Sequence, residues 1–227
     1  MIDTLLFDLD NTLLDFDKAE ANAITRALDD VGISVTNEMR DCYHKINLAQ
    51  WKLLEQGKMT REEVKMRRFK LLFQEFDIKA SPQEVAKHYQ DYLGQGHYFI
   101  EGAEEVLQEL SKRFRIYLVT NGTLSVQRGR LKSSGIEKYL QGVFISEEIG
   151  YNKPSIVYFE KCFSKIPDFK KENTAIIGDS LSSDIQGGIN AGIKTIWFHR
   201  AQDLTEDPQP KPDYEINSLK SLLKMLK

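Results

Sequence analysis

Asp8 and Asp10 stand two residues apart in the stretch FDLDNTLLD, directly after the hydrophobic run of residues 4–7. Paired acids of this kind are candidates for metal binding or acid–base catalysis. Two carboxylates this close repel each other, and burying them costs several kcal/mol unless a cation or hydrogen bonds compensate. The stretch by itself is equally compatible with a surface turn in which Asp10 or Thr12 caps the next helix. The rest of the chain therefore has to decide between a site and a turn.

Further polar side chains follow the ends of later hydrophobic runs. The triplet TNG (residues 120–122) ends the run RIYLVTNG, and Asp179 ends TAIIGDS, with Asp184 five residues further on. Lys153 lies in YNKP, just after the run GVFIS. In an open parallel sheet, ligands bind at the carboxyl ends of the strands. We therefore expect these side chains to converge on one rim of a sheet.

The expected rim brings together four carboxylates, one hydroxyl and one lysine. Four carboxylates cannot share a small space without a cation, and a set of oxygen ligands favours Mg²⁺, which keeps waters and accepts a substrate phosphate. A metal ion and Lys153 would allow Asp8 and Asp10 to lie close together. Each short motif is weak evidence alone. The specific signal is that all of them occur in this order, each after its own strand.

Five hydrophobic runs predict the strands that position these residues. They cover residues 4–7, 115–122, 142–146, 174–180 and 193–199. Helical patterns lie between them, and two of these patterns end at Gly135 and Gly192, which suit helix C-caps. Strands that alternate with helices are typical of right-handed βαβ units. The sequence therefore predicts an α/β fold with a Rossmann-like, five-stranded parallel core sheet and helices on both faces.

Residues 16–96 interrupt the alternation, because they contain only helical patterns. Thr60 and Glu63 form a capping box at the start of one helix, and Ser81-Pro82 is a cap followed by proline at the first helical position. Three glycines in GQGHYFIEG (residues 94–102) suit a hinge where the insert returns. We expect a catalytic core formed by residues 1–15 and 97–227 and a small all-helical cap domain formed by residues 16–96.

Composition narrows the class of protein further. The chain has 227 residues, of which 41% are hydrophobic and 29% charged, and its net charge is −3. No basic stripe stands out, which argues against a nucleic acid polymer as partner. The apolar runs are far too short for a membrane span, and the N-terminus does not resemble a signal peptide. Cys42 and Cys162 are predicted to be reduced core thiols of a cytoplasmic protein. The oligomeric state stays undetermined.

The set DLDNT, TNG, NKP and GDSLSSD resembles the four motifs of the haloacid dehalogenase-like (HAD) phosphohydrolase superfamily. The insert of residues 16–96 is similar to the small helical cap of that superfamily. The resemblance implies that Asp8 is the nucleophile that forms an aspartyl-phosphate and that Asp10 is the general acid and then the general base. An aspartate at position 10 also implies a phosphatase or phosphomutase, because a dehalogenase needs no acid there.

The same resemblance implies the ligands of the metal and of the phosphate. Mg²⁺ would be held by Asp8, the backbone carbonyl of Asp10 and Asp179, with Asp184 close by or acting through a water. The phosphoryl group would be bound by the residues of the second and third motifs, which are Thr120, Asn121, Gly122 and Lys153. The implied partner is a small-molecule phosphomonoester, with neither a nucleic acid polymer nor a membrane involved.

The cap sequence INLAQWKLLEQGKMTREEVKMRRF, with TNGTLSVQRGRLKSSGI and SEEIGYNKP, resembles the small-cap 5′-nucleotidase branch. This resemblance implies (deoxy)nucleoside monophosphates, mainly pyrimidine forms, as substrates. Asn47 and Trp51 lie at i and i+4 of one helix, and Phe16 lies at the hinge, where an aromatic face could meet a base. Arg67 could meet a polar edge. Trp51 could equally be a core residue of the cap, and Arg67 a solvated surface residue.

Two other functions stay open on these residues. A sugar phosphate phosphatase or phosphomutase of the same fold would use the same four motifs, and release of free phosphate separates a phosphatase from a mutase. A phospho-accepting signalling receiver also places acids, a threonine and a lysine at the ends of a parallel sheet. The receiver is a remote alternative, because it needs about half this length and its acid pair is adjacent rather than split.

Overall fold

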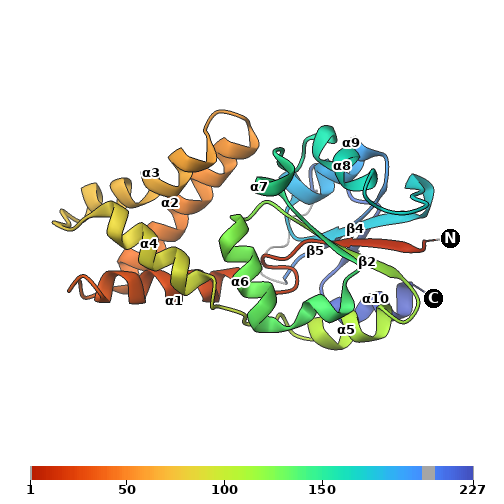
Figure 1. The fold of residues 1–227 in the computed structure, drawn as a ribbon, viewed down its shortest axis with the longest axis horizontal. Helices are drawn as coiled ribbons and strands as arrows, with labels where there is room; N and C mark the ends of the chain where they lie inside the picture. Colours follow the sequence, from red (N-terminus) through yellow and green to blue (C-terminus); the bar gives the residue numbers. More distant parts are fainter. Residues whose placement is uncertain (1, 201–207, 227) are drawn as a thin grey trace.

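A computed structural model describes residues 2–200 and 208–226 of the chain. Within these residues a parallel sheet forms the centre, with strand order β3-β2-β1-β4-β5-β6 (Figure 1). The strands are β1 (Thr4–Phe7), β2 (Arg115–Thr120), β3 (Gly142–Ile145), β4 (Thr174–Gly178), β5 (Lys194–Phe198) and β6 (Tyr214–Ile216). The five predicted strands are thus confirmed, but the sheet has a sixth. The edge strand β6 is too short, at three residues, to give a recognisable pattern.

Helices cover both faces of the sheet because successive strand residues point to opposite sides. Leu5 and Phe7 of β1 belong to one buried cluster, whereas Leu6 belongs to another. On the first face lie α5 (Ala103–Leu110), α6 (Leu124–Ser134), η1 (Ile136–Tyr139), η5 (Leu219–Ser221) and α10 (Leu222–Met225). On the second lie α7 (Ser146–Ile149), α8 (Ile156–Phe163) and α9 (Gln186–Ala191). Two short turns, η2 (Lys171–Asn173) and η3 (Leu181–Ile185), flank β4.

The segment after β1 forms a separate group of helices, as the sequence predicts. These are α1 (Phe16–Asp29), α2 (Asn37–Glu55), α3 (Arg61–Glu75) and α4 (Pro82–Leu93). The predicted capping box at Thr60 and Glu63 is present, and Ser81 caps α4. The helices enclose their own buried cluster, in which Tyr43, Phe69 and Tyr89 meet with ring centroids 5.3–5.5 Å apart.

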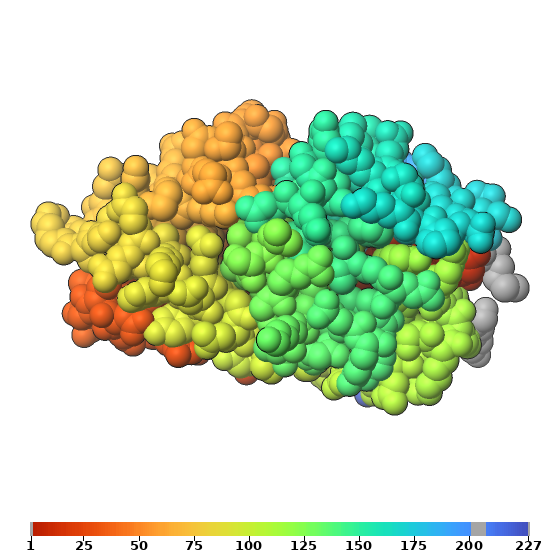
Figure 2. Space-filling view, in the orientation of Figure 1, coloured from red at the N-terminus to blue at the C-terminus, as the bar shows by residue number. Residues whose placement is uncertain are grey.

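The helical region α1–α4 lies beside the carboxyl ends of the strands, while the start of β1 and the helix α10 lie toward the opposite end of the molecule (Figure 1). Its orange-to-yellow helices meet the green surface formed by α6 (Figure 2). Val126 of α6 belongs to the buried cluster of the helical region, so the two parts share apolar contacts. Among the described residues, none of the helices combines the length and apolar character that crossing a membrane requires. Both cysteines are free thiols, but only Cys162 is buried and Cys42 is half-buried.

Candidate active site

Asp8 lies at the carboxyl end of β1, where its backbone N–H donates to Ile177 O of β4 over 2.9 Å. The chain then turns sharply at Asn11, whose φ of 58° is in the left-handed region. The side-chain Oδ1 of Asn11 accepts hydrogen bonds from the backbone N–H groups of Phe16 and Asp17, at 2.9 and 3.3 Å. Asn11 therefore bonds the first turn of α1, which Asp15 caps, and so fixes the start of the helical region close to Asp8.

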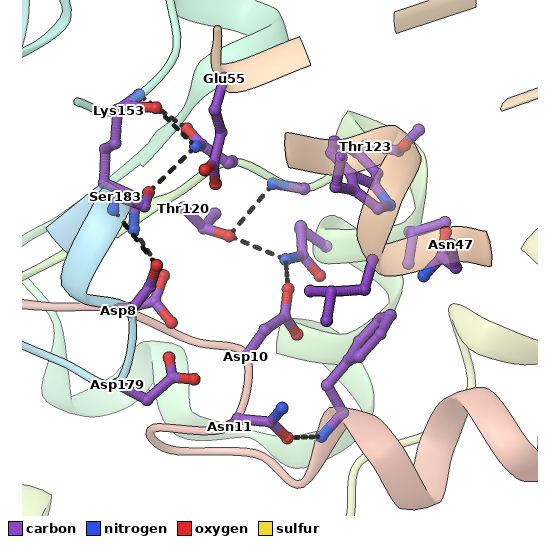
Figure 3. A pocket seen from close by; sticks show the side chains of 18 of the residues that line it. Asp8, Asp10, Asn11, Asn47, Glu55, Thr120, Thr123, Lys153, Asp179 and Ser183 are labelled. Atoms are coloured by element: carbon purple, nitrogen blue, oxygen red, sulfur yellow. Dashed lines mark hydrogen bonds and ion pairs between the residues drawn. The ribbon is translucent and has the colours of Figure 1, made fainter. Parts of the chain in front are cut away.

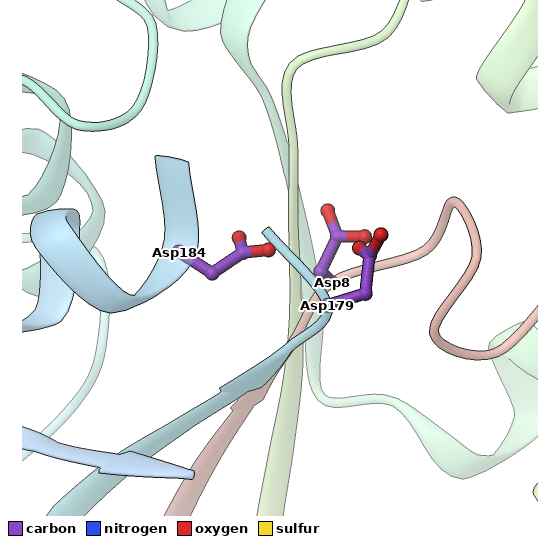
Figure 4. A group of neighbouring side chains, drawn as sticks. All are labelled: Asp8, Asp179 and Asp184. Carbon is purple, nitrogen blue, oxygen red and sulfur yellow. The ribbon is translucent and has the colours of Figure 1, made fainter. Parts of the chain in front are cut away.

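Three carboxylates gather at the ends of β1 and β4 (Figure 4). Asp8, Asp179 and Asp184 each offer an oxygen within 4.8 Å of the others. Asp184 lies in η3, and a Cβ at Gly178 would come within 2.3 Å of its carboxylate, so only glycine fits there. Of the four carboxylates predicted to converge, these three lie in one group, and the carboxylate of Asp10 is not part of it.

Lys153 is the cation that the structure places against this cluster. Its Nζ lies 2.6 Å from Asp8 Oδ1, 2.6 Å from Asp184 Oδ1 and 2.9 Å from Val119 O. Burial raises the pKa of Asp8 to about 7, with repulsion from Asp184 and Asp10 adding to the rise and the charge of Lys153 opposing it. Burial likewise raises the pKa of Asp179 well above its usual range, and repulsion from Asp8 and Asp184 adds to this.

Three carboxylates face one lysine, so the charge of Lys153 does not neutralise the cluster. The donor atoms facing one another are carboxylate oxygens, which suit a hard divalent cation such as Mg²⁺ and not a soft metal. A cation there would offset the repulsion that raises both pKa values. The residues present therefore fit the predicted Mg²⁺.

The TNG triplet begins at the last residue of β2, Thr120, which is buried and faces the carboxylates (Figure 3). Its Oγ1 accepts a hydrogen bond from Gly122 N over 3.3 Å. The side chain of Asn121 bonds the backbone of the neighbouring motif loop. Its Nδ2 donates to Lys153 O at 2.9 Å, and its Oδ1 accepts from Lys153 N at 2.8 Å. The Asn121 side chain therefore ties the two motif loops together, and phosphate binding through the backbone N–H groups after Thr120 stays a prediction.

The carboxylate of Asp10 points away from Asp8 toward α6 (Figure 3). Its Oδ2 accepts a hydrogen bond from Gln127 Nε2 at 2.7 Å, and its Oδ1 is paired with Arg130 Nη1. Neither α6 residue was predicted as part of the site. The available signal was weak: Gln127 and Arg130 are three residues apart on the helix that follows TNG and therefore share a face.

A cavity of about 270 Å³ extends from the carboxylates to the helical region. Of the cap residues predicted to bind substrate, Phe16, Asn47 and Trp51 line it. Arg67 does not, because it is exposed on the outer surface of α3. Its neighbour Arg68 is buried and lines the cavity instead. Adjacent helical residues point about 100° apart, and only the packing of α3 decides which arginine faces inward.

A buried polar network forms the wall of the cavity in the helical region. Glu20 is 2% exposed, and its two carboxylate oxygens meet His44 Nδ1 and Asn47 Nδ2, each at 2.6 Å. Arg68 Nη1 donates to Asn47 Oδ1 at 2.8 Å. The amide of Asn47 is thus fixed at both ends. His44 Nδ1 faces Glu20, and this hydrogen bond raises the pKa of the His44 imidazole.

Arg61, at the start of α3, connects the helical region to the motif loops and was not predicted from the sequence. Its Nη1 donates to the backbone carbonyls of Asn121 and Gly122 at 2.8 and 3.1 Å. Its Nη2 donates to Ser146 Oγ and Asn152 Oδ1, both at 2.6 Å. Its guanidinium lies 5.4 Å from the centre of the Trp51 ring.

Two further contacts join the helical region to the core. Glu55 of α2 lines the cavity and accepts a hydrogen bond from Ser182 Oγ at 3.2 Å. Lys65 Nζ of α3 lies 2.9 Å from Glu147 Oε1 of α7. Together with Arg61, these contacts hold α2 and α3 over the strand ends.

Comparison with known proteins identifies a family and several relatives of this chain. The family model described as haloacid dehalogenase-like hydrolase matches residues 5–198. The chain is 43% identical to pyrimidine 5′-nucleotidase PynA of Streptococcus pneumoniae over 98% of this chain and 94% of that protein. It is 27% identical to pyrimidine 5′-nucleotidase YjjG of Escherichia coli, covering 99% and 97%. The crystal structure of the HAD-hydrolase YfnB of Bacillus subtilis bound to magnesium matches with a TM-score of 0.94 at 40% identity, covering 100% of this chain and 99% of that chain.

Proposed function

The chain belongs to the haloacid dehalogenase-like hydrolases, and we propose that it is a Mg²⁺-dependent phosphatase that acts on pyrimidine nucleoside monophosphates. One observation carries the proposal. A single cavity joins the carboxylate cluster at Asp8 to a wall that offers aromatic rings and a fixed amide, at Phe16, Trp51 and Asn47. The first part suits a phosphate and the second a planar base.

The proposed reaction has two steps. An oxygen of Asp8 attacks phosphorus and the ester P–O bond breaks, while Asp10 gives its proton to the leaving 5′-oxygen. A water then attacks the aspartyl-phosphate, Asp10 takes up the proton of that water, and the bond between phosphorus and Asp8 breaks to release phosphate. Splitting the reaction in this way replaces one difficult step by two easier ones. Asp10 can serve in both steps because it recovers in the second the proton that it gave in the first.

Several residues would stabilise the charge that develops on the phosphoryl group. Lys153 Nζ already lies 2.6 Å from Asp8 Oδ1, beside the expected position of the phosphorus. The hydroxyl of Thr120 and the backbone N–H groups after it would bind phosphoryl oxygens. Mg²⁺, when bound by Asp8, Asp179, Asp184 and the backbone carbonyl of Asp10, would neutralise further negative charge.

The preference for a pyrimidine nucleotide draws on the two relatives with that activity in their names, PynA and YjjG. It also fits the wall of the cavity. Asn47 and Arg68 hold fixed polar groups toward a base, and the ring of Trp51 provides a stacking surface. Recognition of a polar edge by fixed, buried groups excludes analogues that lack that edge.

We also propose that residues 16–96 act as a cap domain that closes over the bound nucleotide. Their separate buried cluster and their contacts to the motif loops through Arg61 support this division. Closure would exclude water from the aspartyl-phosphate and select the leaving group. The two free thiols support a cytoplasmic location.

The test is a substrate screen with Mg²⁺ that measures free phosphate. Nucleoside monophosphates of all bases, hexose phosphates and 4-nitrophenyl phosphate are compared by kcat/KM. We expect the highest values for pyrimidine nucleotides, and loss of all activity in Asp8→Asn with an unchanged circular dichroism spectrum. A preference for hexose phosphates would overturn the nucleotide assignment. Conversion of hexose phosphates to isomers without free phosphate would favour a phosphomutase. Residual Asp8→Asn activity within about tenfold of wild type would contradict the covalent route.

A further inference from the structure

Both oxygens of the Asp10 carboxylate are held by α6. Gln127 Nε2 donates to Asp10 Oδ2 at 2.7 Å and to Thr120 Oγ1 at 2.8 Å, so one amide connects the acid to the phosphate-binding threonine. Arg130 Nη1 pairs with the other oxygen, Asp10 Oδ1, and also donates to Gln127 Oε1 at 3.3 Å. The carboxylate therefore has one defined orientation rather than free rotation about its side chain.

Arg130 is a charged residue in a fully buried position. It is 0% exposed, although the Asp10 side chain that it pairs with is 29% exposed. Burying a guanidinium is costly unless its donors are used, and a residue needed only for packing would be apolar. Among the described residues, its Nη2 has no hydrogen-bond partner. The hydrogen bonds of Arg130 therefore offset only part of the cost of burying its charge.

The Nε of Arg130 bonds the segment in which the chain returns from the helical region to the core. Its Nε donates to Gly96 O at 2.9 Å. On the outgoing side, its guanidinium lies 5.8 Å from the centre of the Phe16 ring. A Cβ on Gly129 would come within 2.6 Å of Gly94 O, so α6 touches the returning backbone directly. One side chain thus contacts the acid and both connections to the helical region.

We propose that Arg130, assisted by Gln127, is a positioning residue that holds the Asp10 carboxylate for proton transfer and ties its position to the two connections of the helical region. The inference rests on the proposed phosphatase chemistry, in which Asp10 protonates the leaving oxygen. A proton can be transferred only at hydrogen-bond distance from the atom that receives it. A movement of residues 94–96 would move Gly96 O and, through Arg130, the acid.

This role makes a prediction that a packing role does not make. Protonation matters for a nucleoside 5′-oxygen, which is a poor leaving group, but matters little for 4-nitrophenolate, which leaves readily without a proton. Loss of Arg130 should therefore slow the first step for the nucleotide selectively. The comparison requires the rate of the first turnover, because Asp10 acts again as base in the second step with either substrate.

The experiment measures leaving-group release in a single turnover with enzyme in excess, using rapid quenching for the nucleoside and absorbance for 4-nitrophenolate. In Arg130→Met we expect nucleoside release to fall by about 100-fold, the low end of general acid catalysis, and 4-nitrophenolate release to change by less than about tenfold. Arg130→Lys should recover part of the nucleoside rate, since it keeps the charge beside Asp10. Gln127→Leu should act in the same direction with a smaller effect.

Arg128→Met is the matched control, because Arg128 lies on the exposed side of the same helix, where it pairs with Glu148 at 3.2 Å. Equal losses for both leaving groups in the Arg130 and Gln127 variants, or lowered melting temperatures with wild-type rates, would overturn the positioning role. Asp10→Asn tests the proposed acid role of Asp10 separately from the positioning role of Arg130. If Asp10→Asn shows the selective loss and the Arg130 variants do not, only this inference fails. If Asp10→Asn shows no selectivity either, the acid role of Asp10 in the proposed function fails.

Discussion

Lys153 Nζ lies 2.6 Å from Asp8 Oδ1, in a position where 1% of Lys153 is exposed to solvent. Burial lowers the pKa of Lys153, but the charges of Asp184 and Asp8 outweigh this and raise the pKa above its ordinary value. The ammonium group is therefore charged at neutral pH. It holds the proposed nucleophile in place before any substrate arrives.

Lys153→Met should destabilise the metal-free protein strongly. Removing one member of a buried ion pair leaves an uncompensated charge, which typically costs about 3–5 kcal/mol. We expect a loss of this size in the free energy of unfolding from urea titrations in chelator, and a smaller loss in Mg²⁺. Lys132→Met, at an exposed position of α6, serves as control. Equal stability of the two variants would contradict the ion pair's structural role.

Removal of the metal should abolish turnover. The three carboxylates repel one another without a cation, so a chelator should also lower the melting temperature, and added Mg²⁺ should raise it again with the logarithm of the concentration once the site is mostly filled. Ca²⁺ should inhibit, because its larger and looser shell can bind Asp8 through both oxygens. Activity assays and thermal melts over a metal titration provide the measurement. Full activity in chelator would remove the metal from the mechanism.

Trp51→Ala should affect nucleotides alone. Stacking of a base on an aromatic ring is worth about 1–3 kcal/mol, so KM for the nucleoside monophosphate should rise by roughly tenfold or more. Turnover of 4-nitrophenyl phosphate should hardly change, because that substrate lacks a base. Steady-state kinetics with both substrates decide the matter. If both activities fall together with the melting temperature, Trp51 is a packing residue. If neither changes, Phe16 becomes the next candidate.

Arg61→Ala should weaken closure of the helical region over the site. The variant loses all four hydrogen bonds from Arg61 to the core, two of them to the carbonyls of Asn121 and Gly122. Bonds from a charged donor are worth about 1.5–3 kcal/mol each, so kcat/KM should fall at least tenfold. Arg67→Ala, at an exposed position of the same helix, is the matched control. Wild-type kinetics in Arg61→Ala would show that these bonds do not contribute to closure.

Stability should depend on pH through His44. The hydrogen bond to Glu20 raises the pKa of His44 above 6.5, with Asp17 and Asp41 adding to the rise, so the folded protein holds this proton more tightly than the unfolded chain. The stabilisation is fully present below pH 6.5 and is lost as the pH rises through the folded pKa. Urea titrations between pH 5.5 and 8.5 should show a larger loss in the wild type than in His44→Gln, because the raised pKa values of Asp8 and Asp179 contribute a loss that both proteins share. Parallel curves for the two proteins would rule His44 out as the source.

Local patterns in the sequence were enough to identify one part of the site. A buried run followed by an acid identifies a strand and its carboxyl end, so the amino-acid order alone assigns Asp8, Asp10 and Asp179 to one rim. The helices of residues 16–96 were equally accessible, because their caps and apolar spacing lie within a few residues of each other. Both kinds of signal depend on residues that are close together in the sequence, so they can be recognised without knowledge of the tertiary structure.

The side chains that meet across long stretches of chain became visible only in the folded molecule. Arg130 reaches Asp10 across 120 residues, and Arg61 reaches Asn121 across 60. The choice of Arg68 over Arg67 depends on the rotation of α3 against its neighbours, and the strand β6 forms only because β5 offers it an edge. These outcomes depend on packing between distant elements, and the direction in which a side chain points is fixed only once that packing exists.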